Sequence, residues 1–213
     1  MHPYYEPFLK LVNEENKDEA MTYVLNLLKD KKIELYDLYD FFLRPVLNEF
    51  ECSSEDEEIC IWKEHVRTSI VRTILESTYP YLIEIKKTVP KNHQKVMVVC
   101  PSEEFHEVGA IIVTNYFSLA GFDAQYIGAN TPKNDILSAV KALKPDYLAL
   151  SVTNYYNLVV TKQITEQVKG LYPNVKIIVG GNAFNKPGAL DHLVYDYHLT
   201  NKEDIFELGG KKK

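Results

Sequence analysis

Short apolar runs alternate with helical patterns through the second half of this chain. The runs that read as strands are 95–100, 123–127, 146–152, 175–179 and 193–197, and the helical patterns are 107–119, 132–143, 155–171 and 202–208. Several of the runs are continuously apolar, which is typical of strands buried on both faces. Strands that alternate with helices form parallel sheets, because each parallel neighbour needs a crossover connection. We therefore expect a five-stranded parallel sheet within residues 91–213.

The first ninety residues follow a helical period instead. Apolar side chains recur at spacings of three and four over 21–28 and again over 33–47, where Pro45 should bend or split the helix. An acidic cap at Ser53–Glu57 should open a long helix that runs to about residue 85. Three or four such helices make a bundle. The expected class is α/β, with an N-terminal four-helix bundle at 1–90 followed by a flavodoxin-like (Rossmann-like) five-stranded parallel sheet.

Charge is distributed unevenly along the chain. Residues 1–90 carry 18 Asp/Glu against 11 Lys/Arg, a balance of −7, whereas residues 91–213 carry 12 against 13, a balance of +1, so the acidic surplus of the chain lies in its first ninety residues. A segment that binds nucleic acid would be basic, so we expect no direct contact with DNA or RNA. No apolar run reaches the ~18–20 residues of a membrane span, so no membrane partner is expected. Three cysteines without a CxxC pair favour a reducing, cytoplasmic location.

Any ligand should lie at the carboxyl edge of the sheet, where open parallel α/β sheets bind their ligands. The loops that build this edge are 101–107, 128–131, 151–154 and 180–184. No GxGxxG follows the first strand and no GxxxxGK[ST] occurs anywhere. Nicotinamide and P-loop nucleotide sites therefore lose their main support.

The loop after the first strand carries the strongest candidates, Glu104, His106 and Gly109. A histidine binds a metal through one ring nitrogen when a partner holds the other, and Glu104 is placed to accept that second N–H. Gly109 permits a bulky group to approach the backbone closely. The alternative is that His106 is simply a polar loop residue near a helix start.

Two further loops add candidates. Ser151 and Thr153 follow the third strand, where their hydroxyls either cap the next helix or bond a polar ligand. Gly180 and Gly181 follow the fourth strand, and Phe184 belongs to the same loop. The glycine pair either makes a tight turn or lets a flat group or a phosphate lie against bare backbone.

In strand order, these loops resemble the cobalamin (vitamin B12)-binding domain, through Glu104-x-His106-x-x-Gly109, Ser151-x-Thr153 and Gly180-Gly181. The resemblance implies cobalamin bound in the base-off/His-on mode, with its dimethylbenzimidazole tail displaced and buried in the domain. It implies that His106 is the lower axial cobalt ligand and Glu104 its partner. It also implies that the other two patterns line the slot for the tail, and that the upstream bundle caps the upper face of the corrin.

Two departures bear on the subfamily. Methyl carriers of the family usually have Asp at the position of Glu104 and Leu at that of Thr153. This chain looks more like the cobalamin-sensing domains of light-dependent MerR-type regulators, although their DNA-binding domain is not expected in the acidic first half. Glu64 and His65 resemble the pair that those sensors place over the upper corrin face. Trp62 lies only two residues before that pair, and we expect it in the helical core.

The resemblance therefore implies a non-enzymatic, cobalamin-dependent sensor or signalling module that acts through a homo-oligomer or a protein partner. The alternative is a corrinoid methyl-carrier subunit of a methyltransferase system. A third reading is a chain of this architecture that binds no corrinoid. Whether the native cofactor is the adenosyl-, methyl- or hydroxo- form is left open.

Overall fold

The computed structural model describes residues 2–50 and 57–210, except for the side chains of 57 and 58. The expected cap at Ser53–Glu57 falls largely outside these residues. Contacts divide the chain into two units, Met1–Glu84 and Ile85–Lys213. Each unit is described by itself below.

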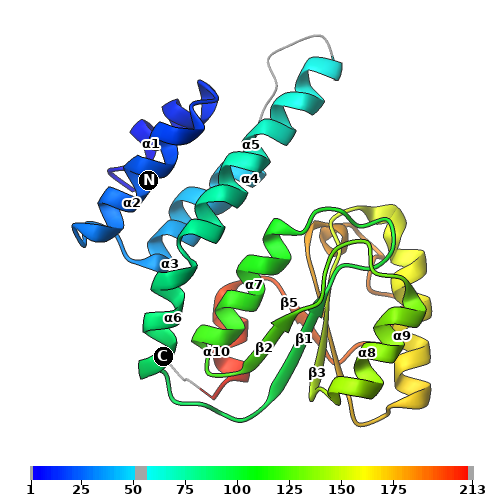
Figure 1. The fold of residues 1–213 in the computed structure, drawn as a ribbon. Helices are drawn as coiled ribbons and strands as arrows, with labels where there is room; N and C mark the ends of the chain where they lie inside the picture. Colours follow the sequence, from blue (N-terminus) through cyan, green and yellow to red (C-terminus); the bar gives the residue numbers. More distant parts are fainter. Residues whose placement is uncertain (1, 51–56, 211–213) are drawn as a thin grey trace. The chain divides into compact units, whose positions relative to one another are not determined.

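The second unit is built on a parallel sheet, as expected (Figure 1). Its strands are β1 (Lys95–Val99), β2 (Asp123–Tyr126), β3 (Tyr147–Ser151), β4 (Lys176–Gly180) and β5 (Tyr197–Leu199). They lie in the order β2-β1-β3-β4-β5, and every neighbouring pair is parallel. This is the flavodoxin-like order, in which the chain changes direction between β1 and β3. The loops after those two strands therefore flank the crevice where such sheets bind ligands.

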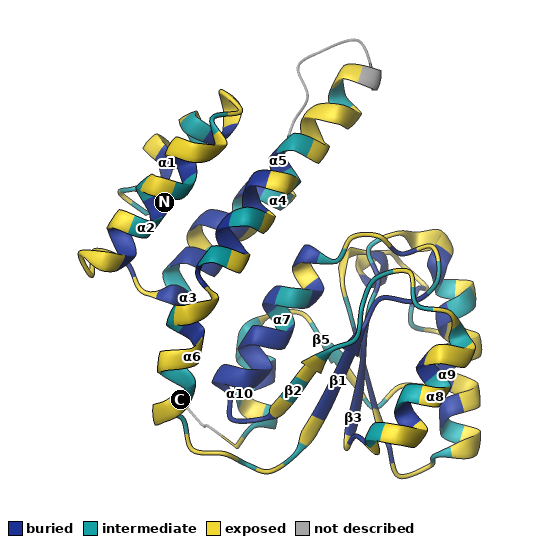
Figure 2. Ribbon diagram, in the orientation of Figure 1, coloured by how far each residue is buried: buried dark blue, intermediate teal, exposed yellow. Residues whose placement is uncertain are grey.

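Helices cover both faces of this sheet (Figure 1). They are α7 (Val108–Leu119), α8 (Lys133–Leu143), α9 (Leu158–Leu171) and α10 (Lys202–Leu208). Helix α8 contacts α9 on one face, and α7 contacts α10 on the other. Successive side chains of β1 point to opposite faces of the sheet. Met97 and Val99 therefore pack in the core beneath α8 and α9, whereas Val96 and Val98 face the other side of the sheet. Figure 2 shows β1 and β3 buried along almost their whole length.

Two details of this unit differ from the expected pattern. The last strand was expected at 193–197 and is found at Tyr197–Leu199. The helix expected from residue 155 begins as a 3-10 turn, η2 (Tyr155–Asn157), before α9. The side chain of Asn154 caps this turn by accepting from the backbone N–H of Tyr156, and the Asn157 side chain at its end bonds two groups of the His106 loop.

The first unit consists of helices joined by short turns over its described residues, as expected. Its elements are α1 (Tyr5–Asn13), α2 (Lys17–Lys29), α3 (Leu35–Asp37), η1 (Leu38–Leu43), α4 (Arg44–Asn48) and α5 (Glu57–Ser77), and α6 (Tyr79–Thr88) leads out of it. Pro45 interrupts the third pattern: η1 is a π-helical segment, and α4 begins immediately before the proline. The buried rings of Tyr5, Phe8 and Phe42 pack together in the core.

Two expectations for this unit are wrong. The long helix does not continue to residue 85, because it breaks at Thr78. The Thr78 hydroxyl donates to the carbonyl of Leu75, and Pro80, two residues later, has no backbone N–H to donate to a continuing helix. Trp62 is not a core residue, since 45% of it is exposed on the surface of α5. Among the residues that the structure describes, no helix is long and apolar enough to cross a membrane.

Candidate functional site

The carboxyl edge of the sheet is formed by loops that bond to one another. The loop after β1 joins the loop after β2 through a bridge between Pro101 and Thr131. The backbone N–H of Asn130 donates to the carbonyl of Glu104 at 2.9 Å. The side-chain oxygen of Asn130 accepts from the backbone N–H of Glu103 at 2.8 Å. These bonds fix the backbone on both sides of Glu104.

Glu104 and His106 form a hydrogen-bonded pair at this edge. The Nδ1 atom of His106 lies 2.5 Å from Oε1 of Glu104, and the backbone N–H of His106 donates to the same oxygen at 3.2 Å. The glutamate side chain is fully buried, whereas 55% of the histidine side chain is exposed. One member of the pair is thus held inside the protein and the other faces outward.

The second carboxylate oxygen of Glu104 collects three donors from the loop after β3. It accepts from the backbone N–H groups of Thr153 at 2.8 Å and Asn154 at 2.9 Å, and from Nδ2 of Asn157 at 3.2 Å. Such a set of donors repays the cost of burying a charge. Asn157 also donates to the carbonyl of Glu103 at 3.1 Å, so one buried amide joins the two loops.

These contacts determine the protonation of the pair. Burial by itself would raise the pKa of Glu104, but the hydrogen bonds from His106, Asn154 and Thr153 outweigh it and lower the pKa to about 2. An ionised carboxylate can only accept, so the proton between the two side chains sits on Nδ1 of His106. A neutral imidazole with its proton on Nδ1 carries its lone pair on Nε2, which is the form that binds a metal.

A second network lies behind the histidine loop. The hydroxyl of Tyr126 donates to Oε2 of Glu107 at 2.9 Å, and the thiol of Cys100 lies 3.9 Å from the same hydroxyl. Burial raises the pKa of the Cys100 thiol to about 11 and also raises the pKa of Tyr126, so both groups stay protonated at neutral pH. This network holds the start of α7 against the end of β2.

The structure places the other sequence-predicted residues of this edge as follows. Thr153 contributes its backbone N–H to Glu104, and Ser151 pairs with Gly180 in the register of β3 and β4. Gly181 has φ +111°, and a Cβ there would collide with the carbonyl oxygen of Val152, so the turn itself requires glycine. Phe184 is buried in the core cluster between the sheet, α8 and α9.

Glu64 and His65 lie on α5 in the first unit, and both are exposed. Asn154, Asn157 and Tyr126 also make contacts at the sheet edge, and sequence reasoning did not name them as site residues. The two asparagines of the segment 153–157 could have indicated a turn that bonds neighbouring loops, because asparagine favours turns and loop contacts over helix interiors.

Comparison with known proteins places this edge in a family. The family model described as "B12 binding domain" matches residues 94–207, which include all five strands and every loop of the carboxyl edge. The chain belongs to the B12-binding domain family. Cobalamin is therefore its cofactor, and the B12-binding domain is the second unit of the fold.

Several relatives resemble this B12-binding domain protein in sequence. The trimethylamine corrinoid protein of Methanosarcina barkeri is 33% identical over 101 residues, which is 46% of this chain and 46% of that protein. The HTH-type transcriptional repressor CarA of Myxococcus xanthus is 25% identical over 172 residues, 81% of this chain and 51% of the repressor. The chain thus spans about half the length of these two relatives. Trimethylamine corrinoid protein 1 of Methanosarcina acetivorans is 27% identical over 159 residues, 73% of each chain.

One solved structure has the same fold over nearly the whole chain. The monomethylamine corrinoid protein of Methanosarcina barkeri superposes with a TM-score of 0.80, covers 96% of both chains and shares 15% sequence identity. The fold of a helical bundle followed by a Rossmann-like domain is therefore shared. At this identity the likeness concerns architecture alone.

The residues of the B12-binding domain fit a bound cobalamin. His106 offers an exposed imidazole whose tautomer and orientation are fixed by a buried carboxylate. Gly109 lies in the first turn of α7, three residues away, and a Cβ there would meet nothing within 4 Å. Among the described residues nothing requires a glycine at that point, whereas a bulky group that lies against the helix start would favour one.

Proposed function

We propose that this chain is a corrinoid carrier protein, which holds cobalamin through His106 and passes a methyl group between separate methyltransferases. The observation that carries the proposal is the Glu104–His106 pair on an exposed edge, within a family whose cofactor is cobalamin. The names of the similar corrinoid proteins favour a carrier over a sensor, and methylated amines are the methyl donors that their names suggest. A carrier of this kind is not itself the catalytic enzyme.

The proposed roles follow from the contacts. When bound, cobalamin supplies a cobalt atom that can accept and release a methyl group. His106 would hold this cobalt through Nε2, while Glu104 holds the proton on Nδ1. The three donors on the other oxygen of Glu104 keep the carboxylate from turning away. The same buried carboxylate would also stabilise His106 as an imidazolium, so the pair could hold a proton at Nε2.

Other residues would shape the rest of the site. We propose that Ser151, Thr153, Gly180 and Gly181 line the slot for the nucleotide tail, and that Phe184, buried in the core beneath the same loop, supports it from inside. This is supported by their common position at the ends of β3 and β4. We also propose that Glu64 and His65 contact the upper face of the corrin, since both are exposed on α5. The units 1–90 and 91–213 would then act as a cap and a cofactor-binding domain.

A cobalamin-dependent sensor is the second candidate function. It is favoured by the match to the repressor CarA, which extends over 81% of this chain and so reaches beyond the B12-binding domain into the helical unit. Glu104 in place of the Asp usual in methyl carriers points the same way. A sensor would respond through its oligomeric state or a protein partner rather than by methyl transfer.

The first experiment tests the ligand. Protein labelled with ¹⁵N is loaded with unlabelled hydroxocobalamin, reduced to Co(II), and studied by electron paramagnetic resonance. An axial nitrogen from the protein gives a doublet superhyperfine pattern, whereas the cofactor's own unlabelled base gives a triplet. We expect the doublet in the wild type and its loss in His106→Ala. The exposed His192 provides the matched control, because His192→Ala should keep the doublet. A triplet in the wild type would contradict the proposed ligand.

The second experiment separates the two functions. The Co(I) form is mixed with methylamines and a methyltransferase encoded beside this chain, and methylation is followed in the visible spectrum. Rapid methylation supports a carrier. The adenosylcobalamin form is illuminated in parallel and its oligomeric state is measured by size-exclusion chromatography with light scattering. A change on illumination together with no methylation would overturn the carrier in favour of the sensor.

A further inference from the structure

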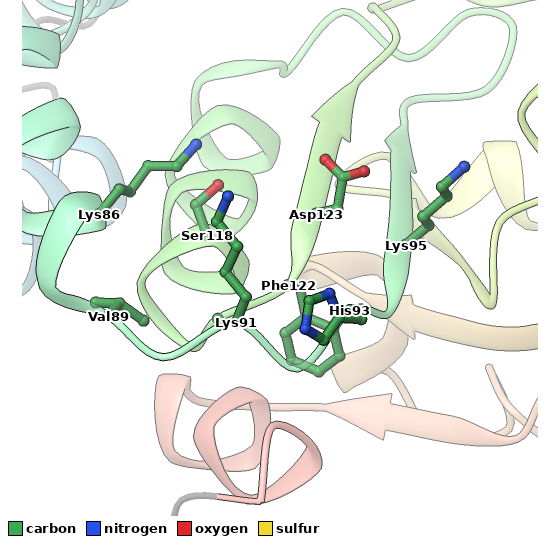
Figure 3. A pocket seen from close by; sticks show the side chains of 9 residues that line it. Lys86, Val89, Lys91, His93, Lys95, Ser118, Phe122 and Asp123 are labelled. Carbon is green, nitrogen blue, oxygen red and sulfur yellow. The ribbon is translucent and has the colours of Figure 1, made fainter.

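A pocket opens at the end of the sheet opposite to the His106 loop (Figure 3). Its volume is about 410 Å³, within the range of sites that hold small molecules. Lys95 and Asp123 line it at the first residues of β1 and β2, whereas the His106 loop follows the last residue of β1. The pocket is therefore separate from the proposed cobalamin site, by the length of the strands.

The lining of the pocket carries an excess of positive charge. Lys86, Lys91 and Lys95 contribute three ammonium groups, and Asp123 contributes one carboxylate. With His93 neutral, these groups leave a net charge of +2 at pH 7. Within the described part of the chain, none of the three ammonium groups lies within ion-pair distance of a carboxylate. A ligand with two negative charges would match this excess.

Donors converge on one side of the pocket. In Figure 3 the amines of Lys86 and Lys91 and the hydroxyl of Ser118 point toward the same region, and Lys95 lies on the other side of Asp123. The apolar part of the lining comes from Val89 and from the buried ring of Phe122. Ammonium and hydroxyl groups together suit the oxygens of a phosphate, which accepts several hydrogen bonds at once.

The walls of the pocket are preformed. The backbone N–H of Asn92 donates to the carbonyl of Gly121 at 3.0 Å, and the backbone N–H of Asp123 donates to the carbonyl of Gln94 at 2.8 Å. Gly121 has φ +101°, and a Cβ there would collide with the carbonyl oxygen of Pro90. The segment 90–94 is thus packed tightly against the turn between α7 and β2. A ligand would not have to order these residues first.

One buried donor in this segment lacks an acceptor. Nδ2 of Asn92 is the single buried side-chain nitrogen or oxygen without a hydrogen-bond partner among the described residues. It belongs to the residue between Lys91 and His93, both of which line the pocket. A buried donor without an acceptor costs free energy unless something supplies one. Asn92 does not itself line the pocket, so this donor marks a polar position beside the site rather than a contact with the ligand.

We propose that this pocket binds a small phosphate dianion, either free phosphate or a phosphomonoester whose organic part lies against Val89 and Phe122. Four of the residues that build it, Lys86, Val89, Lys91 and His93, come from the segment that connects the two units. Occupancy of the pocket would therefore stabilise the connecting segment in the conformation that it has here. The proposal concerns the amino-terminal end of the sheet and does not depend on the proposed carrier function.

The test is a calorimetric titration of the full chain at constant ionic strength, with inorganic phosphate and phenyl phosphate as probes. We expect saturable binding of one phosphate per chain, with phenyl phosphate binding more tightly if the organic part uses the apolar wall. The double variant Lys86→Met/Lys91→Met should weaken binding at least about tenfold, because hydrogen bonds from charged donors each contribute this much or more. The His93 ring resonances should shift on titration of the wild type.

The matched control removes the same charge elsewhere. Lys141 and Lys162 lie exposed on α8 and α9, outside the pocket, so Lys141→Met/Lys162→Met should bind phosphate as the wild type does. Equal weakening in both double variants would show a general charge effect and overturn the proposal, as would the absence of saturable binding in the wild type. Titrations are repeated with cobalamin bound. Phosphate binding that disappears with cobalamin but survives Lys86→Met/Lys91→Met would place the phosphate at the cofactor edge and also overturn the proposal.

Discussion

Replacing Glu104 by glutamine should leave the chain folded but detach His106 from cobalt. Three donors converge on Oε2 of Glu104, so the single oxygen of a glutamine would take that position. Its NH2 group would then face Nδ1 and the backbone N–H of His106, which are both donors in the wild type. To accept from this NH2 group, the imidazole must move its proton from Nδ1 to Nε2. The nitrogen that should bind cobalt is then protonated.

The magnitude follows from the pKa of the carboxyl group. Its pKa is lowered from 4.5 to about 2 in the folded chain, which corresponds to roughly 3 kcal/mol of stability for the ionised form. Because the folded pKa is the lower one, this stabilisation is complete above about pH 4.5 and is lost as the pH falls toward 2. The difference in free energy of unfolding between wild type and Glu104→Gln should therefore shrink by about that amount over this range.

The assay has two parts. Urea unfolding from pH 6 down to pH 2 measures the difference in stability, and the visible and Co(II) resonance spectra of the loaded proteins at pH 7 report the axial ligand. The neighbouring Glu103 is exposed, and Glu103→Gln should behave as the wild type in both. A Glu104→Gln protein that retains the His-on spectrum with unchanged affinity would refute the reasoning about the tautomer. A stability difference that does not change with pH would refute the reasoning about the carboxylate.

Three further substitutions test the edge. Gly109→Leu should leave the melting temperature unchanged, because a side chain there meets open space. The same variant should weaken cobalamin binding, followed by spectrophotometric titration, at least about tenfold. The control Gly170→Leu, which also meets open space but lies on α9, should bind cobalamin as the wild type does. Gly181→Ala should lower the free energy of unfolding in urea by about 1–3 kcal/mol or more, since it adds strain at a positive φ and a collision with Val152; a wild-type unfolding curve would contradict this. Asn157→Leu should cost about 1–3 kcal/mol in the same assay, because it removes one donor from a buried carboxylate, and should raise the dissociation constant for cobalamin. Unchanged values for both quantities would show that Asn157 does not position Glu104.

The architecture could be predicted from the sequence because its signals are local. The runs at 95–100 and 146–152 are apolar and β-branched or leucine-rich, and the helices between strands are amphipathic, so the element types follow from periodicity. The Glu104–His106 contact was equally accessible, because the two residues are two positions apart on one loop. The family resemblance added the cofactor, which periodicity alone could not supply.

What could not be predicted depends on contacts between distant residues. The amides of Thr153 and Asn154 reach Glu104 across about fifty positions, and nothing in a single sequence marks that pairing. The exposure of Trp62 was missed for a related reason: helical spacing selects a face but does not say whether another element covers it. The break at Thr78 depends on a side-chain bond to the preceding turn, which the apolar period does not register.

The hydrogen bonds that tie Glu104 to the loop after β3 also bear on the order in which the chain folds. The His106 loop is local and can form as soon as β1 and α7 are made, but its carboxylate meets its donors only when β3 has paired with β1. Closing a loop of this length is slow compared with local turns. A partly folded chain thus carries the histidine before it carries the means to orient it. Cofactor that arrives early finds no oriented ligand, so insertion of cobalamin should follow, and report, the completion of the sheet.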